Sequence, residues 1–265
     1  MSPILLPEVL PLLIGTGGFD HALIWTPPDF QPSERLPVAY MLDGQNVFLA
    51  DEDVSERGWP GSWRGVQTAS ALAEQGKRLV LVAVPHGPNR IAEYTLQPDP
   101  EHGGGEGAAT LARIIDLLKP LVDSRYGTRT DAAGTALIGS SLGGLLALYS
   151  GLGHPQTFGF LGVLSPSMWW SDRAVLKDVA AAFLRSEQHY AVSTGDREGQ
   201  TAEGSAAQVA ETRALHAALL QAGAQATISI LPGRIHHEST WASHLLAVLD
   251  AFWTHANPHA NGGEA

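Results

Sequence analysis

The chain has 265 residues, of which 44% are hydrophobic and none is cysteine, and its formal net charge is −11 at pH 7. A chain of this length can bury a full core without disulfides, and the lack of cysteine excludes a disulfide framework, thiolate metal sites and a cysteine nucleophile. The acidic balance disfavours nucleic acid and anionic membrane surfaces as partners, which leaves small molecules.

The N-terminal segment carries apolar runs at residues 4–6 and 10–14, but prolines interrupt them and no basic residue precedes them. A secretory signal combines a basic start with an uninterrupted apolar stretch, and a membrane span needs roughly 18 consecutive apolar residues. Neither pattern occurs, so we expect a cytoplasmic protein.

Apolar runs of strand length alternate with amphipathic stretches of helical length, which is typical of parallel strands joined by crossover helices. The predicted strands are 22–25, 37–42, 79–84, 136–138, 158–164, 190–193 and 227–231, and the predicted helices are 63–73, 108–122, 142–152, 173–184, 206–222 and 239–253. We therefore expect an α/β fold with a mostly parallel central sheet and helices on both faces.

The alternation indicates one domain over residues 1–265, with a core at about 20–253 and a disordered tail at 256–265. Two long connections, 49–62 and 85–107, interrupt it. Connections of this length in a compact domain are usually lids, binding loops or disordered stretches.

One motif carries chemistry: a short apolar strand leads into Gly139-Ser140-Ser141-Leu142-Gly143 and then directly into a helical pattern. This G-x-S-x-G arrangement predicts a nucleophile elbow, in which Ser141 sits on a tight strand-to-helix turn with its hydroxyl exposed above the sheet. Composition alone would produce about 0.2 such patterns in this chain, so the flanking strand and helix carry the assignment. The alternative is a glycine-rich turn with a capping serine.

A serine nucleophile needs a base and an acid, which in this arrangement follow it in the order acid, then histidine. The loop after the last predicted strand offers His236 and His237, and the loop after the preceding strand offers Asp196 and Glu198. The residues alone leave both pairs open. Neither histidine has the spacing of a zinc-binding helix, so no metal site is expected.

The chemistry also needs two backbone donors for the developing oxyanion. The residue after the nucleophile supplies one, the amide of Leu142, and the loop containing Asp43-Gly44-Gln45 supplies the other, the amide of Gln45. The alternative for this loop is an ordinary Asp-Gly turn. A glycine run at residues 102–105 imitates an oxyanion motif, but it does not follow a strand and is set aside.

The residues resemble the putative-esterase branch of the α/β-hydrolases, which includes enterochelin esterases, feruloyl esterases, S-formylglutathione hydrolases and mycolyltransferases. The resemblance covers about residues 20–253 and rests on six blocks: Tyr40 to Phe48, Arg90 to Thr95, Leu118 to Tyr126, Gly139 to Gly144, Leu164 to Trp170 and His236 to Trp241. It implies the α/β-hydrolase fold and activity on carboxylic esters.

The resemblance also selects among the open site residues. The family histidine stands five residues before a tryptophan. Here that tryptophan is Trp241, so the resemblance selects His236 as the base. The acid of related feruloyl esterases corresponds to Glu198, with Asp196 as the alternative. The relatives' oxyanion loop supports Gln45. Arg90, followed by Glu93, resembles an element at the mouth of the active site that binds substrate or forms a loop-stabilising ion pair.

The expected function is a serine carboxylic-ester hydrolase that works through an acyl-enzyme intermediate without a cofactor. Trp169 and Trp170, with Trp59 and Trp63, are candidates for lining the substrate cleft, although burial in the core is the alternative for at least one of the first two. The substrate classes considered are short acyl, feruloyl-type and siderophore esters, and Arg90, Arg197 and Arg234 could supply local positive charge for an anionic siderophore. An acyltransferase and a non-catalytic binding protein are the alternative functions, and the oligomeric state stays open.

Overall fold

The computed structural model describes residues 7–12, 18–48 and 61–260. An eight-stranded sheet forms its centre, with the strand order β1-β2-β4-β3-β5-β6-β7-β8. The strands are β1 (Glu8–Pro11), β2 (His21–Trp25), β3 (Val38–Leu42), β4 (Val80–Val84), β5 (Thr135–Ser140), β6 (Phe160–Leu164), β7 (His189–Gly195) and β8 (Gln225–Leu231). The seven predicted strands correspond to β2–β8.

Pairing in the sheet is parallel from β4 through β3, β5, β6 and β7 to β8. At one edge of the described sheet, β2 is antiparallel to both of its neighbours, β1 and β4. Every residue of β3, β4 and β6 is buried, as expected for parallel strands covered by helices on both faces. The carboxyl ends of the parallel strands therefore meet at one edge of the fold, where ligands of such sheets bind.

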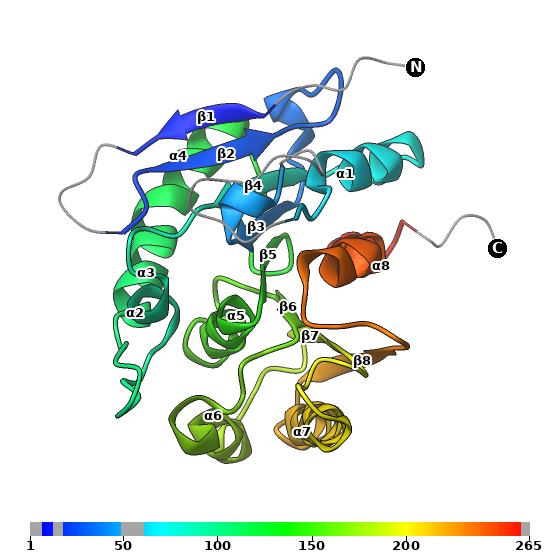
Figure 1. Ribbon diagram of the computed structural model, residues 1–265. Helices are drawn as coiled ribbons and strands as arrows, with labels where there is room; N and C mark the ends of the chain where they lie inside the picture. Colours follow the sequence, from blue (N-terminus) through cyan, green and yellow to red (C-terminus); the bar gives the residue numbers. More distant parts are fainter. Residues whose placement is uncertain (1–6, 13–17, 49–60, 261–265) are drawn as a thin grey trace.

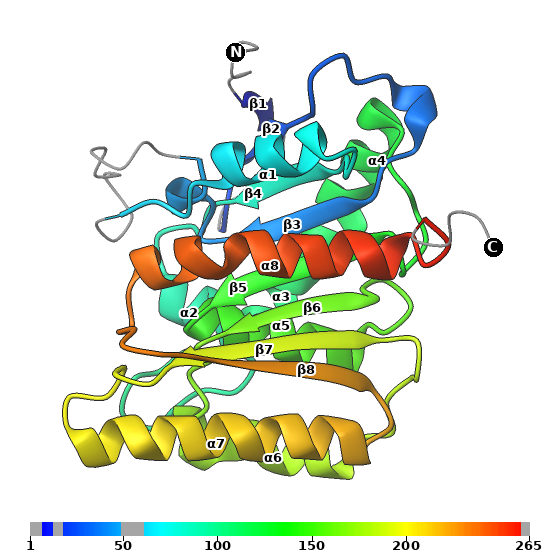
Figure 2. The ribbon, with the colours of Figure 1, turned by 90° about the vertical axis from the view of Figure 1, so that its right-hand side faces the viewer.

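Helices cover both faces of the sheet (Figures 1 and 2). The helices are α1 (Gly65–Glu74), α2 (Arg90–Tyr94), α3 (Gly107–Arg113), a π-helical turn at Ile114–Leu118, α4 (Lys119–Tyr126), α5 (Leu142–Gly153), α6 (Trp170–Ala181), α7 (Ala202–Gln221) and α8 (Glu238–Ala256). One core joins the sheet to α3–α7 through residues such as Leu146 and Leu215. The other joins it to α1 and α8 through Leu72 and Leu245. This is the predicted α/β-hydrolase architecture.

Of the two long connections predicted from the sequence, 85–107 is fully described and 49–62 is mostly not. The segment 85–107 contains the short helix α2 and a turn closed by a bridge between Asp99 and Gly103. Most of the connection 49–62 lies outside the described residues. At the C-terminus, α8 continues to Ala256, and a hydrogen bond from Ala260 N to Asn257 O closes a turn after it; the remainder of the predicted tail is also outside the described part.

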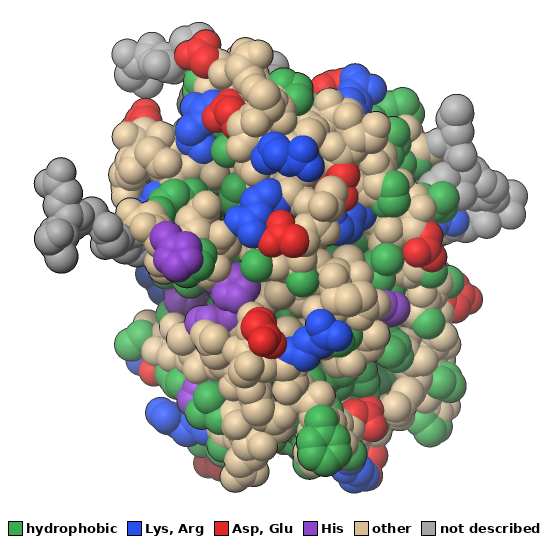
Figure 3. Space-filling model, turned by 180° about the vertical axis from the view of Figure 1, so that it is seen from behind, with side chains coloured by type: hydrophobic (Ala, Val, Ile, Leu, Met, Phe, Trp, Pro, Cys, Tyr) green, Lys and Arg blue, Asp and Glu red, His purple; other side chains and the backbone are tan. Residues whose placement is uncertain are grey.

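In the described ranges, no helix is both long enough and apolar enough to cross a bilayer. Figure 3 shows the face opposite to the view of Figure 1, on which acidic and basic side chains are interspersed among polar and apolar ones.

Candidate active site

The elbow is built by Ser141, which stands between the end of β5 and the start of α5. Its backbone angles, φ 57° and ψ −123°, lie in a region that non-glycine residues avoid. Glycines surround it because the turn leaves no room: a Cβ on Gly139 would lie 2.4 Å from the carbonyl oxygen of Gly143. The amide of Ser141 donates to Leu164 O at 3.0 Å, which ties the elbow to β6.

The Ser141 hydroxyl faces a cavity of about 420 Å³ at the carboxyl edge of the sheet. Its oxygen lies 3.2 Å from the hydroxyl oxygen of Ser167, and the amide of Ser167 donates to Ser141 O at 3.1 Å. The cavity is lined by Arg90, Ser141, Leu142, Ser165, Pro166, Ser167, Trp169, Glu198, Gly199, Gly204, Gln208 and His236.

Glu198 and His236 lie in the loops that follow the neighbouring strands β7 and β8, and both line this cavity. The β7–β8 ladder ends with Gly195 opposite Leu231, so the two following loops start side by side. There Nδ1 of His236 lies 2.9 Å from Oε2 of Glu198, and the carboxylate side chain is only 2% exposed against 38% for the imidazole. The ring is thus held by a buried acid while its other side stays open to the cavity.

The buried carboxylate of Glu198 has several hydrogen-bond donors. Burial raises its pKa, but hydrogen bonds from His236, Ser165 and the Gly195 amide outweigh that effect, and the net pKa of Glu198 is lowered. The carboxylate is therefore held in its charged form, which is the form that stabilises an imidazolium beside it.

Asp196, the alternative acid, has a different environment. It is exposed in the turn after β7, and its Oδ1 accepts the amide of Gly233 at 2.7 Å. The structure brings Glu198, and not Asp196, into hydrogen-bond contact with His236.

Comparison with known proteins identifies the family of this chain. The sequence profile of the family described as "Putative esterase" matches residues 20–252. The chain belongs to this family.

This esterase, a hydrolase of carboxylic esters, is 25% identical over 239 residues to protein YbbA of Bacillus subtilis, an alignment that covers 86% of this chain and 90% of YbbA. It is 34% identical over 201 residues to the siderophore enterobactin esterase of Emericella nidulans, covering 66% of this chain and 63% of that protein. The crystal structure of the enterobactin esterase FES from Shigella flexneri, in the presence of enterobactin, superposes with a TM-score of 0.72 at 22% identity, covering 96% of this chain and 60% of that one. This last likeness shows the α/β-hydrolase fold.

The two predicted oxyanion donors differ in position. Leu142 opens α5 and lines the cavity, so its amide is one of the first in the helix, which have no acceptor within the helix. Gln45 lies in the 3₁₀ turn Gly44–Asn46 after β3, and its side-chain oxygen accepts the amide of His86 at 3.3 Å. In the described part of the chain, Gln45 is not among the residues that line the cavity.

Arg90 lines the cavity and is also an ion-pair partner, although not of Glu93. Its guanidinium donates to both oxygens of Asp43, from Nε at 2.6 Å and from Nη2 at 2.7 Å. Asp43 adopts φ 53° directly before the turn that carries Gln45, and its amide donates to the hydroxyl of Tyr94 at 2.9 Å. Burial lowers the pKa of Arg90, but Asp43 more than offsets this, so the net pKa rises and the side chain stays charged.

The predicted aromatic residues separate into lining and core positions. Trp169 is 47% exposed and lines the cavity, whereas Trp170 is buried and its indole donates to Gln97 O at 2.8 Å. Trp63 is buried against Trp241, with ring centroids 5.7 Å apart, and Trp59 lies outside the described residues. Of the four, only Trp169 is a described lining residue.

Arg197 and Arg234, the other candidate cations, are exposed and linked through their backbones, since Arg197 N donates to Arg234 O at 2.9 Å. Neither is among the described lining residues of the cavity. Of the lysines and arginines in the described ranges, only Arg90 lines the cavity, where its guanidinium is paired with Asp43.

The sequence reasoning passed over three polar side chains that line the cavity: Ser165, Ser167 and Gln208. The first two lie within three residues of the end of β6. Their position after a buried parallel strand was the available signal, because strand carboxyl ends gather at the ligand-binding edge. Gln208 lies within α7, where sequence gives no comparable signal.

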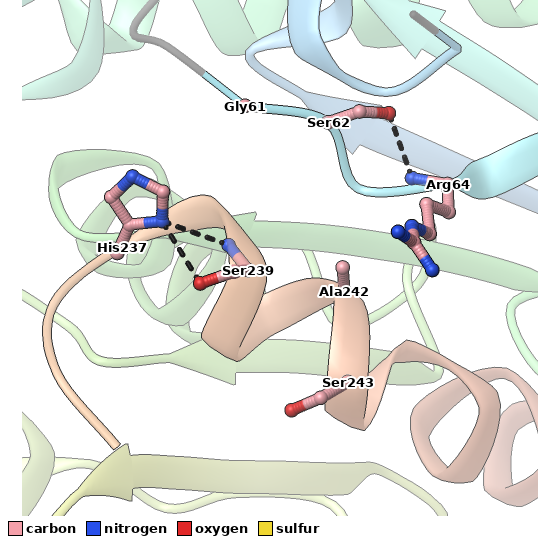
Figure 4. Close-up of a pocket in the computed structure, with 7 residues that line it drawn as sticks. All are labelled: Gly61, Ser62, Arg64, His237, Ser239, Ala242 and Ser243. Atoms are coloured by element: carbon pink, nitrogen blue, oxygen red, sulfur yellow. Dashed lines mark hydrogen bonds between the residues drawn. The ribbon is translucent and has the colours of Figure 1, made fainter. Parts of the chain in front are cut away.

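His237 lies outside this cavity and caps α8. Its Nδ1 accepts the amide of Ser239 at 3.1 Å. Figure 4 shows it at the rim of a neighbouring cavity between the segment from Gly61 to Arg64 and the first turns of α8. The adjacent histidines therefore point into different cavities.

Proposed function

We propose that the protein hydrolyses carboxylic esters through a triad of Ser141 as nucleophile, His236 as base and Glu198 as acid. One observation carries the proposal: a serine on a strained elbow shares a cavity with an imidazole that is hydrogen-bonded to a buried carboxylate. Burying a carboxylate costs free energy, and buried carboxylates that are hydrogen-bonded to a histidine in a cavity are typical of functional sites.

The contact at Nδ1 assigns the roles of the two ring nitrogens. With Nδ1–H donating to Glu198, Nε2 of His236 is the basic nitrogen and takes the proton of Ser141 as its oxygen attacks the ester carbonyl. The amides of Leu142 and Gln45 receive the oxyanion, and His236 returns the proton to the leaving alcohol. Water, deprotonated by the same nitrogen, then attacks the acyl carbon, and the bond to Ser141 breaks as His236 returns the proton to the serine oxygen, which releases the acid.

The substrate we propose is an ester-linked siderophore. The similarity to the enterobactin esterase of Emericella nidulans supports this class, and so does the cavity wall, where the half-exposed ring of Trp169 and the guanidinium of Arg90 lie. A planar aromatic surface and a cation suit an aromatic, anionic ligand. The overall charge of −11 would otherwise repel such a ligand.

The triad is tested with a fluorophosphonate probe and p-nitrophenyl acetate. We expect the probe to label Ser141 and Ser141→Ala to lose both labelling and at least about 10⁴-fold in kcat. Ser140→Ala, which changes the adjacent buried serine, should retain both. Labelling that survives Ser141→Ala would overturn the assignment.

The substrate class is tested by comparing kcat/KM for enterobactin, methyl ferulate and p-nitrophenyl esters. A preference for enterobactin supports the siderophore proposal, whereas a preference for the small esters overturns it. An added alcohol acceptor separates hydrolysis from acyl transfer, because a transferase would yield more new ester than free acid.

A further inference from the structure

Behind the His236–Glu198 pair lies a closed ring of four side chains: Trp241, Ser165, Glu198 and His236. We propose that Ser165 and Trp241 are positioning residues that fix the acid and the base relative to each other. The inference rests on the proposed triad and deepens it, because it states what holds the imidazole in its working orientation.

The first link is the hydroxyl of Ser165. It lies 2.6 Å from Oε1 of Glu198 and 2.9 Å from the indole nitrogen of Trp241. An indole N–H only donates and an ionised carboxylate only accepts. The direction is therefore fixed: Trp241 donates to Ser165, and Ser165 donates to Glu198.

The backbone holds Ser165 in place for this role. The residue is 1% exposed, its φ is 44°, and its amide donates to Ser193 O on β7 at 2.7 Å. A non-glycine residue with positive φ is costly and persists where its surroundings fix it. The hydroxyl therefore has little freedom to follow the carboxylate if Glu198 moves.

The second link is the ring of Trp241, in the first turns of α8. It is 5% exposed and stands perpendicular to the imidazole of His236, with ring centroids 5.2 Å apart and planes at 89°. The hydrogen bond from Nδ1 to Glu198 fixes one atom of the imidazole but still allows the ring to tilt. Contact with the ring of Trp241 limits this tilt and so fixes the direction of Nε2.

The ring of contacts also sets the charge felt by the base. Removing the Ser165 hydroxyl takes away one of the hydrogen bonds that lower the pKa of Glu198, so the pKa of that carboxylate rises and its charged form is lost at higher pH. Other ionisable groups near the pair are His237 and Glu238 at the start of α8 and Arg90 across the cavity. The variants below leave those three residues unchanged.

The test compares Ser165→Ala and Trp241→Phe, singly and together, using p-nitrophenyl acetate. Alanine keeps the Cβ at the strained position, and phenylalanine keeps a ring but lacks the N–H. We expect Ser165→Ala to lower kcat at least about tenfold, to leave KM within about twofold, and to move the acid limb of the kcat/KM profile to higher pH. Ser165→Cys, a weaker donor, should recover part of the loss.

The double variant, Ser165→Ala with Trp241→Phe, tests whether the two residues act on Glu198 through the same chain of hydrogen bonds. Because the indole N–H reaches Glu198 only through Ser165, the double variant should match Ser165→Ala within about twofold. Trp241→Leu removes the ring as well and should lower kcat further even in the Ser165→Ala background. Ser150→Ala, which removes a buried serine bonded to Ala147 O, is the control and should keep the wild-type profile.

Two outcomes would overturn the inference: a Ser165→Ala variant with wild-type kcat and an unmoved acid limb, or losses in the two single variants that multiply in the double. Labelling of wild-type Ser141 by the fluorophosphonate probe distinguishes a failure of the positioning role from a failure of the proposed triad. If wild type is labelled while the Ser165 and Trp241 variants behave as wild type, only the positioning role fails. If wild type is not labelled, the triad itself fails.

Discussion

The guanidinium of Arg90 donates one hydrogen bond to each carboxylate oxygen of Asp43, from Nε at 2.6 Å and from Nη2 at 2.7 Å. The side chains of Arg90 and Asp43 are only 16% and 8% exposed. The pair joins α2 to the turn after β3. It therefore holds the loop that carries the proposed oxyanion donor, Gln45, and the same guanidinium forms part of the cavity wall.

Arg90→Met is expected to lower the free energy of unfolding by about 3 kcal/mol, because it leaves a buried carboxylate without its partner. Urea denaturation measures the loss. In the double variant Asp43→Asn with Arg90→Met, the buried charge is removed too, and most of the stability should return. Arg90→Met with the stability of wild type would contradict a structural role for the pair.

Glu198→Gln should reduce kcat by about 10³–10⁴-fold with little change in KM, because a neutral amide cannot stabilise the imidazolium and can favour the wrong tautomer. Steady-state kinetics with p-nitrophenyl acetate measures this. Asp196→Asn is the matched control: this exposed acid bonds only the Gly233 amide among the contacts described, and activity should stay within about twofold. The reverse result would transfer the acid role to Asp196.

Ser141→Gly should be more stable than Ser141→Ala by about 1 kcal/mol. Alanine keeps the Cβ at φ 57°, ψ −123°, where the strain costs about 1–3 kcal/mol, while glycine relieves it at an entropic cost of about 0.5–1 kcal/mol. Thermal and urea unfolding of the two inactive variants give the difference. Equal stability would mean that the elbow stores no strain at this residue.

Trp169→Ala and Trp170→Ala should affect different properties. Loss of the half-exposed Trp169 ring is expected to raise KM for an aromatic substrate and to change the unfolding free energy by less than about 1 kcal/mol. Loss of the buried Trp170, at 4% exposure, should cost about 3–5 kcal/mol. Kinetics and urea titrations on both variants separate the roles, and an unchanged KM for Trp169→Ala would remove that ring from substrate binding.

The free energy of unfolding should fall as the pH is lowered from about 6.5 to about 4. Burial lowers the pKa of His255 to about 4, aided by the positive charges of His189 and Arg129. Because the folded pKa lies below the ordinary value of 6.5, the unfolded chain binds the proton more tightly, and stability is lost as the pH falls through this window.

His255→Phe should flatten this pH dependence, since it removes the titrating group from its contact with Phe160. In the described part of the chain, Nε2 of His255 is buried without a hydrogen-bond partner, so an apolar ring loses no bond there. His259→Gln, which changes an exposed histidine, is the control and should follow wild type. An unchanged slope in His255→Phe would assign the acid sensitivity to other groups.

Most strands and helices of the fold could be predicted from local patterns in the sequence. The elbow at Ser141 was predictable because strand, glycines and helix are contiguous. The strand β1 was not, because four residues ending in proline at the sheet edge resemble a loop. The predicted helix 108–122 is interrupted by a π-helical turn before Pro120, since proline has no amide to continue the α-helical bonds.

Contacts between distant residues set the limit of sequence reasoning at the site. The family motif indicated Arg90, but its partner Asp43 lies 47 positions away and no local pattern joins them. Ser165 and Trp241 are 76 positions apart, and the positive φ of Ser165 occurs at a residue type that gives no sign of it. Such pairings follow from strand order, which packing of the whole sheet determines.

Among the described strands, β8 stands at the end of the sheet order and pairs with β7 alone. The loop that follows it carries His236, so the proposed base approaches the proposed nucleophile, Ser141, only after this strand has docked. During synthesis, a ribosome-bound chain could form the elbow at Ser141 long before His236 emerges, and it would do so without activity. Local unfolding of this edge would likewise abolish the proposed hydrolysis while the rest of the domain stayed folded. Turnover would then report whether β8 and the loop that follows it are docked.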